Sequence, residues 1–439
     1  MRLRYGWRGL ALAAAFGIAG LCGGCSRAAM NYQLAESIGT VGKYENNEPV
    51  ETPQMKVERE QRESQEAKEE NLQAQLDAAA ALAEGYYYEE AAAVLQAITG
   101  DDAEDERVAA AISEYQAAQE SLTAYEGDIP HLCFPGLIED TMRAFDGDDM
   151  SYTYSSSMVT VKEFRAMLQS LYENNYVLVD IHSIAGNDTD ARGVTTVEQK
   201  ELLLPPGKKP IIISQDNLNY SGIKNGDGIA TKLVLDDEGN VKALYTDEGG
   251  HDLKGDYDLI PILDAFVEEH PDFSLRGAKG IVSVSAFEGV FGYPVEDSAV
   301  LNYEDNRAAV QKIATRLKET GWSIACAGYD RSYMNEMTVD RLKSDIQQWM
   351  EEVGTLVGET DILFYPYGAE VAYPSDQLDY LLDSGFVYLC GLWADTDFWE
   401  LRDGYMRQTR RFIDGYTLEN VPQYFTNFFD VSQLLDSDR

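Results

Sequence analysis

Histidine and cysteine are scarce in this chain, with 4 His and 5 Cys among 439 residues. Five cysteines are too few for a disulfide-stapled scaffold, and four histidines make a metal site built on several imidazoles hard to assemble. Basic residues are also few: 35 Lys and Arg face 76 Asp and Glu, a net charge of −41. A field of that sign repels nucleic acid, so we expect no nucleic-acid partner. The chain is nevertheless 44% hydrophobic, so it can bury a full core and hold a second unit.

The amino terminus has the pattern of a secretion signal. Three arginines precede an apolar run at residues 10–21, which is shorter than a membrane-spanning helix. The run ends in residues 21–26, Leu-Cys-Gly-Gly-Cys-Ser, which resemble the lipobox of bacterial lipoprotein precursors. The resemblance implies a lipoprotein signal peptide at residues 1–24 and a lipid on Cys25, so we expect an extracytoplasmic protein anchored to a membrane of the cell surface or envelope. Ordinary secretory cleavage near Ala28 is the alternative.

Two segments of different texture follow the signal. Residues 25–55 are polar and lack apolar periodicity, which predicts a tether. Residues 56–127 place apolar side chains at helical spacing, with Gly85 positioned to end a helix. Within them, residues 82–91 resemble the helix-turn-helix of a tetratricopeptide repeat, but one unit is visible where such solenoids need about three. A helical hairpin used as a spacer and a surface for a protein partner both remain open.

From residue 128 to residue 439, short β-branched and aromatic runs alternate with amphipathic helices, as in a parallel sheet. We expect strands in the run ending at Cys133 and at residues 176–180, 210–214, 280–285, 322–326, 361–364 and 386–390, and helices at 160–171, 338–353 and 375–382. An insertion at about 220–277 is expected to hold a β-hairpin and a helix. Seven strands joined by right-handed crossovers favour a closed or nearly closed β/α barrel. Chemistry in such barrels lies on loops at the carboxyl ends of the strands.

Three of these loops carry a family resemblance. Residues 209–217, Lys-Pro-Ile-Ile-Ile-Ser-Gln-Asp-Asn, stand where the polysaccharide deacetylase family has an apolar strand ending in T-F-D-D. Residues 326–331, Cys-Ala-Gly-Tyr-Asp-Arg, stand where it has S-H-T-x-x-H, and residues 365–368, Tyr-Pro-Tyr-Gly, where it has the end of R-x-P-Y-G. The sequence thus resembles these metal-dependent carbohydrate esterases of the NodB-homology type. The resemblance implies an α/β fold, a distorted (β/α) barrel like that of the deacetylases, preceded here by a small all-α segment.

The resemblance also implies that catalysis is altered. Asp216 matches the family's general base, but Asn217 replaces the aspartate that binds the metal, and Ala327 and Arg331 replace its two histidines. A fixed positive charge and missing ligands both oppose a divalent cation. We therefore expect no zinc or other metal cofactor, and we expect Asp216 to be idle as a base.

Two further catalytic residues of the family pattern are missing, and one backbone contact position is kept. The arginine that orients the base falls at Phe364, and no Leu-x-His near the C-terminus supplies an acid. Tyr367 keeps the position whose backbone N–H contacts the acetyl oxygen in the family. The loop around Tyr367 is either such a contact or a tight turn kept for its geometry.

Other residues have more than one interpretation. Trp393 and Trp399 form a platform on which a sugar stacks, or they pack in the interior. An ion pair is expected within the group Arg410, Arg411 and Asp414. Buried thiols are expected at Cys133, Cys326 and Cys390, and surface or strand-end positions at His131, His182, His251 and His270.

The favoured hypothesis is a lipid-anchored, deacetylase-like protein that binds a cell-envelope glycan and does not cut it. Its expected contact residues are Asp216, Asn217, Tyr329, Asp330, Arg331, Tyr365, Tyr367, Trp393 and Trp399. One alternative is an active hydrolase that uses Asp216, acting on carbon–nitrogen bonds other than peptide bonds or, paired with Asp330, on glycosidic bonds. The other is an envelope scaffold that binds a protein partner through residues 56–127.

Overall fold

The computed structural model describes residues 52–189, 195–220, 226–296, 298–299, 301–393 and 395–439. The predicted signal peptide, the lipidation residue Cys25 and all but the last residues of the predicted tether lie outside these ranges. Two compact units divide the chain, residues 1–66 and residues 67–439. None of the described helices is long and apolar enough to span a membrane.

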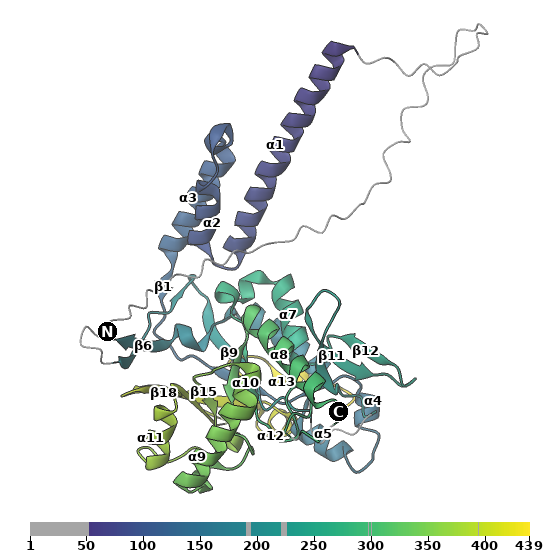
Figure 1. Ribbon diagram of the computed structural model, residues 1–439, viewed down its shortest axis with the longest axis vertical. Coiled ribbons are helices and arrows are strands. Elements are labelled where there is room, and N and C mark those ends of the chain that lie inside the picture. Colours follow the sequence, from purple (N-terminus) through teal and green to yellow (C-terminus); the bar gives the residue numbers. More distant parts are fainter. Residues whose placement is uncertain (1–51, 190–194, 221–225, 297, 300, 394) are drawn as a thin grey trace, which may run out of the picture. The chain divides into compact units, whose positions relative to one another are not determined.

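A closed ring of seven parallel strands forms the centre of the described part of the second unit (Figure 1). In ring order these strands are β13 (Ile281–Val284), β14 (Ser323–Cys326), β15 (Ile362–Phe364), β16 (Tyr388–Leu392), β18 (Tyr405–Phe412), β2 (His131–Phe134) and β9 (Lys209–Gln215), which pairs again with β13. The predicted (β/α) barrel, preceded by a helical segment, is therefore confirmed. The three thiols of Cys133, Cys326 and Cys390 are buried in its strands, as predicted.

The membership of the ring differs from the sequence prediction at two strands. β5 (Tyr176–Leu178) was expected in the barrel, but it pairs with the first half of β9, and β13 takes the same edge of β9 further along. β18 was not predicted and closes the ring between β16 and β2. β17 (Trp399–Arg402) runs antiparallel to β18 outside the ring.

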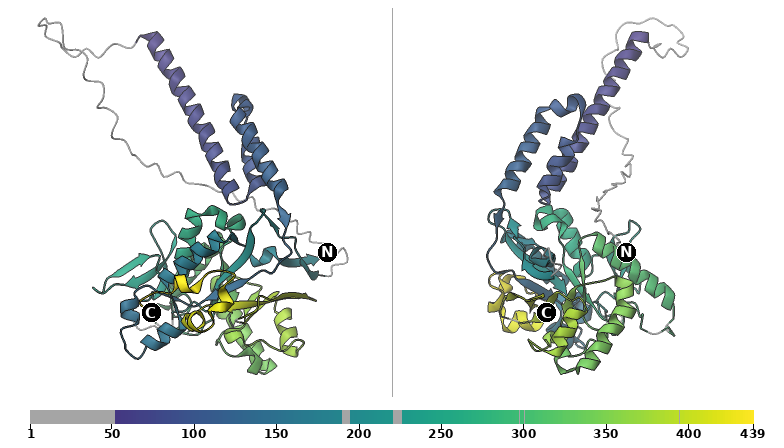
Figure 2. Two further views of the ribbon diagram at one scale, coloured as in Figure 1. Left: turned by 180° about the vertical axis from the view of Figure 1, so that it is seen from behind. Right: turned by 60° about the vertical axis from the view of Figure 1, so that its left-hand side comes forward.

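The crossover helices surround the strands (Figures 1 and 2). They are α6 (Val161–Glu173), α7 (Leu259–Glu269), α8 (Tyr303–Glu319), α9 (Val339–Gln348) and α11 (Asp376–Asp383), and α9 continues through a π-helical turn, Trp349–Gly354, into α10 (Thr355–Val357). α6 shows how the sequence sets such a helix. Thr160 and Glu163 form a capping box at its start, and Phe164, Met167, Leu168 and Leu171 are buried along one face.

The predicted insertion holds two different structures. β10 (Lys232–Leu235), β11 (Val241–Thr246) and β12 (Asp252–Gly255) make an antiparallel sheet beside α7 and α8, so the expected hairpin gains a third strand (Figure 1). α7 is the crossover helix between β9 and β13, and its residues Leu259, Ile260 and Leu263 are buried in the main core. Only the three-stranded sheet is therefore extra to the barrel.

The helical segment consists of α1 (Pro53–Glu84), α2 (Tyr88–Gln96) and α3 (Glu106–Ser121). α1 ends directly before Gly85, as the sequence predicts. In the second unit, Leu72 and Ala79 of α1 share a small core with Leu95 of α2 and Val108 of α3, and α2 and α3 lie side by side (Figure 2). In the first unit, residues 53–66 of α1 are exposed except for the partly buried Arg59, and they carry ion pairs at a spacing of four, such as Arg59 with Glu63.

The remaining elements are short and connect the larger ones. They are β1 (Thr123–Ala124) with β8 (Leu203–Leu204), β3 (Leu137–Ile138) with β4 (Val159–Thr160), β6 (Ala185–Thr189) with β7 (Thr195–Gln199), and the helices α4 (Thr141–Ala144), α5 (Ser151–Ser157), α12 (Gly415–Asn420) and α13 (Val431–Leu434).

Candidate functional site

The residues of the three family-like loops come together at the carboxyl ends of the barrel strands, a region called here the barrel mouth. Asp216 follows β9 directly, and its Oδ1 accepts hydrogen bonds from Arg410 Nη1 at 3.0 Å and from Ser283 Oγ at 3.2 Å. Its Oδ2 lies 3.7 Å from Nη2 of Arg331, on the loop after β14. One carboxylate thus lies between two guanidinium groups.

Arg410 is the residue that the sequence did not assign to the mouth. It lies on β18, is fully buried, and its guanidinium carbon is 3.8 Å from the centre of the Phe364 ring. The family pattern has its base-orienting arginine at position 364, and here an arginine from a different strand reaches the same carboxylate. Alternation along β18 could have revealed it, because residues two apart on a strand share a face and Gln408 and Arg410 both point into the barrel.

The prediction of an ion pair among Arg410, Arg411 and Asp414 is wrong, because both arginines pair with other aspartates. Arg411 pairs with Asp397 at 2.8 Å. Asp414 instead caps the start of α12, where its carboxylate accepts from the backbone N–H of Thr417. Neighbouring residues of a strand point to opposite sides of the sheet, so Arg410 and Arg411 cannot share one partner.

The three positions where the family pattern has metal ligands do not offer a ligand set. The Oδ1 of Asn217 accepts from Ser285 Oγ at 2.6 Å, Ala327 is buried and has no donor atom, and Arg331 brings a cation. Within the described ranges, no group of three or more His, Cys, Asp or Glu side chains could hold a metal ion. The residues present therefore do not fit a divalent metal.

Backbone conformation marks the same three loops. Asn217, Arg331 and Tyr367 have φ angles of 44°, 49° and 58°, in the left-handed region that favours glycine. Each of the loops that resemble the family motifs thus holds a non-glycine residue in a strained conformation. Clusters of such residues are typical of binding and catalytic sites.

Exposed aromatic side chains gather around the mouth. Among the described residues, six aromatic side chains are exposed, and four of them follow the neighbouring strands β13, β14, β15 and β16. These four, called the aromatic rim, are Phe287, Tyr333, Tyr367 and Trp393, with exposures of 44%, 50%, 48% and 54%. The rings of Tyr333 and Tyr367 stack at 4.7 Å, and the guanidinium of Arg331 lies 4.9 Å from the centre of Tyr367.

Sequence reasoning missed two members of the aromatic rim, Phe287 and Tyr333. The signal that could have found them is one large aromatic residue shortly after each of four strand ends. Trp393 and Tyr367 were predicted, and the structure places both at the mouth with exposed rings.

Several other predicted contact residues lie elsewhere. Tyr365 is completely buried and its hydroxyl bonds the Tyr373 hydroxyl at 3.2 Å, so it is not accessible to a ligand. Trp399 lies in β17, partly buried against the barrel interior, so packing is the correct interpretation for this residue. The hydroxyl of Tyr329 donates to Glu352 of the π-helical turn, outside the ring. Asp330 is exposed, and its backbone N–H donates to the carboxylate of Asp345.

The four histidines occupy unlike environments. His131 is the first residue of β2, so its predicted strand-end position is confirmed, and it is completely buried between Gln408 and Ser214. Burial, followed by the charge of Arg410, lowers its pKa to about 3. His182 bridges Asp180 and Asp361; burial lowers its pKa, but the two carboxylates outweigh burial and raise it to about 9. The other two, His251 and His270, contact Asp247 and Tyr172.

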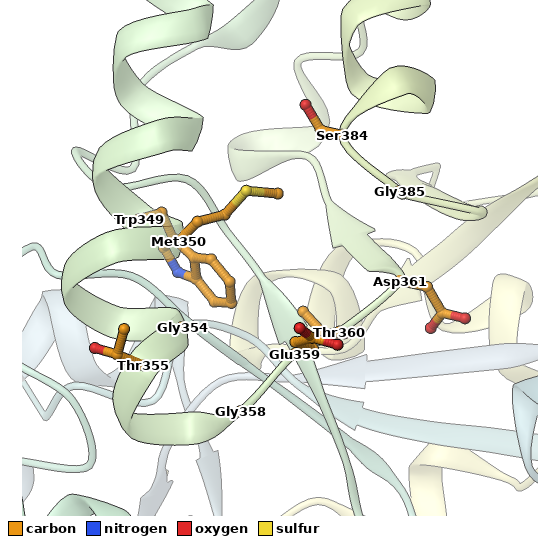
Figure 3. A pocket seen from close by; sticks show the side chains of 10 residues that line it. All are labelled: Trp349, Met350, Gly354, Thr355, Gly358, Glu359, Thr360, Asp361, Ser384 and Gly385. Carbon is orange, nitrogen blue, oxygen red and sulfur yellow. The ribbon is translucent and has the colours of Figure 1, made fainter. Parts of the chain in front are cut away.

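A cavity of about 930 Å³ lies at the opposite end of the barrel (Figure 3). Its walls are the π-helical turn with Thr355, residues 358–361 before β15, and Ser384 with Gly385 before β16. None of the mouth residues lines it, and its charged lining residues are the acids Glu359 and Asp361. This cavity is therefore separate from the candidate site.

Neither known family models nor curated proteins give a match to this chain. One solved structure that is similar is a Streptococcus pyogenes deacetylase, PplD, in complex with acetate. The similarity covers 69% of this chain and 99% of that chain, with 11% sequence identity and a TM-score of 0.39. A similarity at this level says nothing about the chemistry of this chain.

Proposed function

We propose that the protein binds a glycan of the cell envelope at the barrel mouth and does not act as a metal-dependent deacetylase. The observation that carries the proposal is the aromatic rim beside the ion-paired Asp216. Sugars present apolar C–H faces that pack on exposed aromatic rings, while charged and polar groups fix their orientation. Four rings on adjacent strand-end loops can contact more than one sugar unit.

Loss of deacetylation follows from the composition of the mouth. A catalytic zinc lowers the pKa of its bound water from about 15.7 to about 7, so its loss removes roughly 12 kcal/mol of help in forming hydroxide. Arg331 and Ala327 supply no ligand in its place. The carboxylate of Asp216 is already hydrogen-bonded to Arg410 and Ser283, which use its Oδ1.

Removing rim aromatics tests the proposal. We expect wild-type protein to bind oligosaccharides on a glycan array, and Trp393→Ala and Tyr367→Ala each to weaken binding about tenfold, because a stacked ring contributes about 1 kcal/mol beyond its buried area. Leu203→Ala is the control, since Leu203 is an exposed apolar side chain on β8, which precedes the amino end of β9. Metal analysis and an acetate-release assay on the same samples complete the design. Stoichiometric zinc together with acetate release from an N-acetylated glycan would overturn the proposal.

We also propose that the protein is held at the envelope membrane by lipid on Cys25. The support is the lipobox-like sequence that follows the apolar run of residues 10–21. More than one acyl chain gives stable anchoring, as a lipidated N-terminal cysteine would provide.

Metabolic labelling with a fatty acid tests the anchor. Expressed in a bacterial host, wild-type protein is expected to incorporate label, and Cys25→Ala is expected to lose it completely because no other thiol becomes the N-terminus. Cys22→Ala is the matched control and should keep the label. Equal labelling of Cys25→Ala and wild type would rule out this anchor.

A further inference from the structure

A cluster with excess positive charge lies at the mouth of this strongly acidic protein. Arg410 and Arg331 flank the carboxylate of Asp216, so these three side chains together carry one excess positive charge, although the whole chain carries −41. The next carboxylate on the loop after β15, Glu370, is matched by Arg407 at 2.7 Å. Asp330 and Glu288 on the neighbouring loops are exposed, where solvent and salt screen their charges.

Donors at the mouth also outnumber acceptors. Among the described residues, the Nε of Arg331, the Nε and Nη2 of Arg410 and the Nδ2 of Asn217 are buried side-chain donors without a hydrogen-bond partner. The one buried side-chain acceptor without a partner in this region of the described chain is Gln215 Oε1. A buried donor without a partner costs about 1–3 kcal/mol. A ligand that brings acceptor oxygens to the arginine nearest the surface, Arg331, would reduce this imbalance.

Arg331 is the cation that a ligand can reach. Its side chain is 24% exposed, whereas Arg410 is fully buried beneath Asp216. The 3.7 Å separation from Asp216 is too long for a hydrogen bond, so the ion pair does not use the Arg331 donors. The guanidinium carbon of Arg331 lies over the Tyr367 ring, 4.9 Å from its centre, which places the cation next to the aromatic rim.

Building on the proposed glycan-binding function, we infer that the mouth selects an acidic glycan and that Arg331 binds its anionic substituent, a carboxylate or a phosphate. A planar guanidinium pairs with either oxyanion through two parallel hydrogen bonds. The rim then contacts the apolar face of the same sugar or its neighbour. Neutral glycans meet the same rings without the charge-assisted bonds.

Matched pairs of oligosaccharides test the inference: uronates with their carboxyl-reduced forms, and phosphorylated sugars with their dephosphorylated forms. We expect wild-type protein to prefer one acidic form by tenfold or more, with binding that weakens as salt increases. The carboxylate and phosphate arms identify which oxyanion is bound. Arg331→Gln is expected to weaken binding of the acidic form about tenfold to hundredfold and to leave the neutral form unchanged, and Arg331→Lys should restore part of the preference.

The controls separate this inference from the proposed function. Arg402→Gln changes an exposed arginine on β17, opposite the amino end of β18, and should leave both affinities unchanged. Equal affinity for acidic and neutral forms, with Trp393→Ala still weakening binding, would overturn the inference and keep the proposed function. Absence of binding to every oligosaccharide would overturn both. Thermal unfolding of each variant shows that a lost affinity does not come from a lost fold.

Discussion

Replacing Asp216 with asparagine is expected to lower the free energy of unfolding by about 3–5 kcal/mol, the usual effect of removing one partner from a buried ion pair. Arg410 is fully buried, and its Nη1 donates to Asp216 Oδ1 over 3.0 Å. Asparagine leaves that guanidinium without an opposite charge, and arginine cannot lose its proton to escape burial. Urea unfolding followed by circular dichroism measures the difference.

Two further variants make this result specific. Asp330→Asn removes an exposed carboxylate from the loop after β14 and should change the free energy of unfolding by less than about 0.5 kcal/mol. The double variant Asp216→Asn/Arg410→Met removes both charges, and the methionine can pack on Phe364, so most of the lost stability should return. An Asp216→Asn protein as stable as wild type would contradict the buried pair.

Lowering the pH from 6.5 to 3 is expected to remove up to about 5 kcal/mol of stability through His131 alone. Burial and then the charge of Arg410 lower the pKa of this side chain from 6.5 to about 3. Between pH 6.5 and pH 3 the His131 imidazole is therefore protonated in the unfolded chain and neutral in the folded protein. Its contribution to the free energy of unfolding is complete above pH 6.5 and is lost as the pH falls towards 3. Urea unfolding across this pH range should show a shallower loss for His131→Gln than for wild type.

His182 should act in the opposite direction at alkaline pH. Its folded pKa of about 9 lies above the ordinary 6.5, so its contribution is complete below pH 6.5 and is lost as the pH rises through 9. The side chain is 38% exposed, so solvent screening makes this effect the smaller one. His182→Gln is a matched control that should reduce the pH dependence of the free energy of unfolding on the alkaline side only. Identical acid sensitivity of wild type and His131→Gln would show that His131 is not held neutral.

The fold could be predicted because most barrel strands are short apolar runs between amphipathic helices. The exception was β18, whose residues 407–411 are Arg-Gln-Thr-Arg-Arg. Its buried polar side chains are hydrogen-bonded by residues outside β18: His131 contacts Gln408, and Asp216 accepts from Arg410. The sequence of β18 alone does not reveal these partners. β5 was misplaced for the converse reason: it is buried and apolar, but the edge of β9 at the ring is occupied by β13.

The candidate site could be predicted where a motif named its residues or, for Trp393, where an aromatic residue follows a predicted strand. Asp216, Asn217, Arg331 and Tyr367 follow from loop positions, and the structure brings these loops together at the mouth. Arg410 could not be placed because its role depends on which strand closes the ring. Tyr365 and Tyr329 were misplaced because residues next to one another in a loop point in different directions, and sequence alone does not say which of them reaches the ligand.

Asn217, Arg331 and Tyr367 have a consequence for how the protein tolerates heat. A side chain held in the left-handed region gives up about 1–2 kcal/mol that glycine at the same place would keep. Natural proteins are only slightly more stable than they need to be. Three such residues at the mouth therefore lower the free energy of unfolding by a substantial share of that margin. Glycine at these positions would raise the stability of the fold, and it would also remove three side chains from the proposed glycan site.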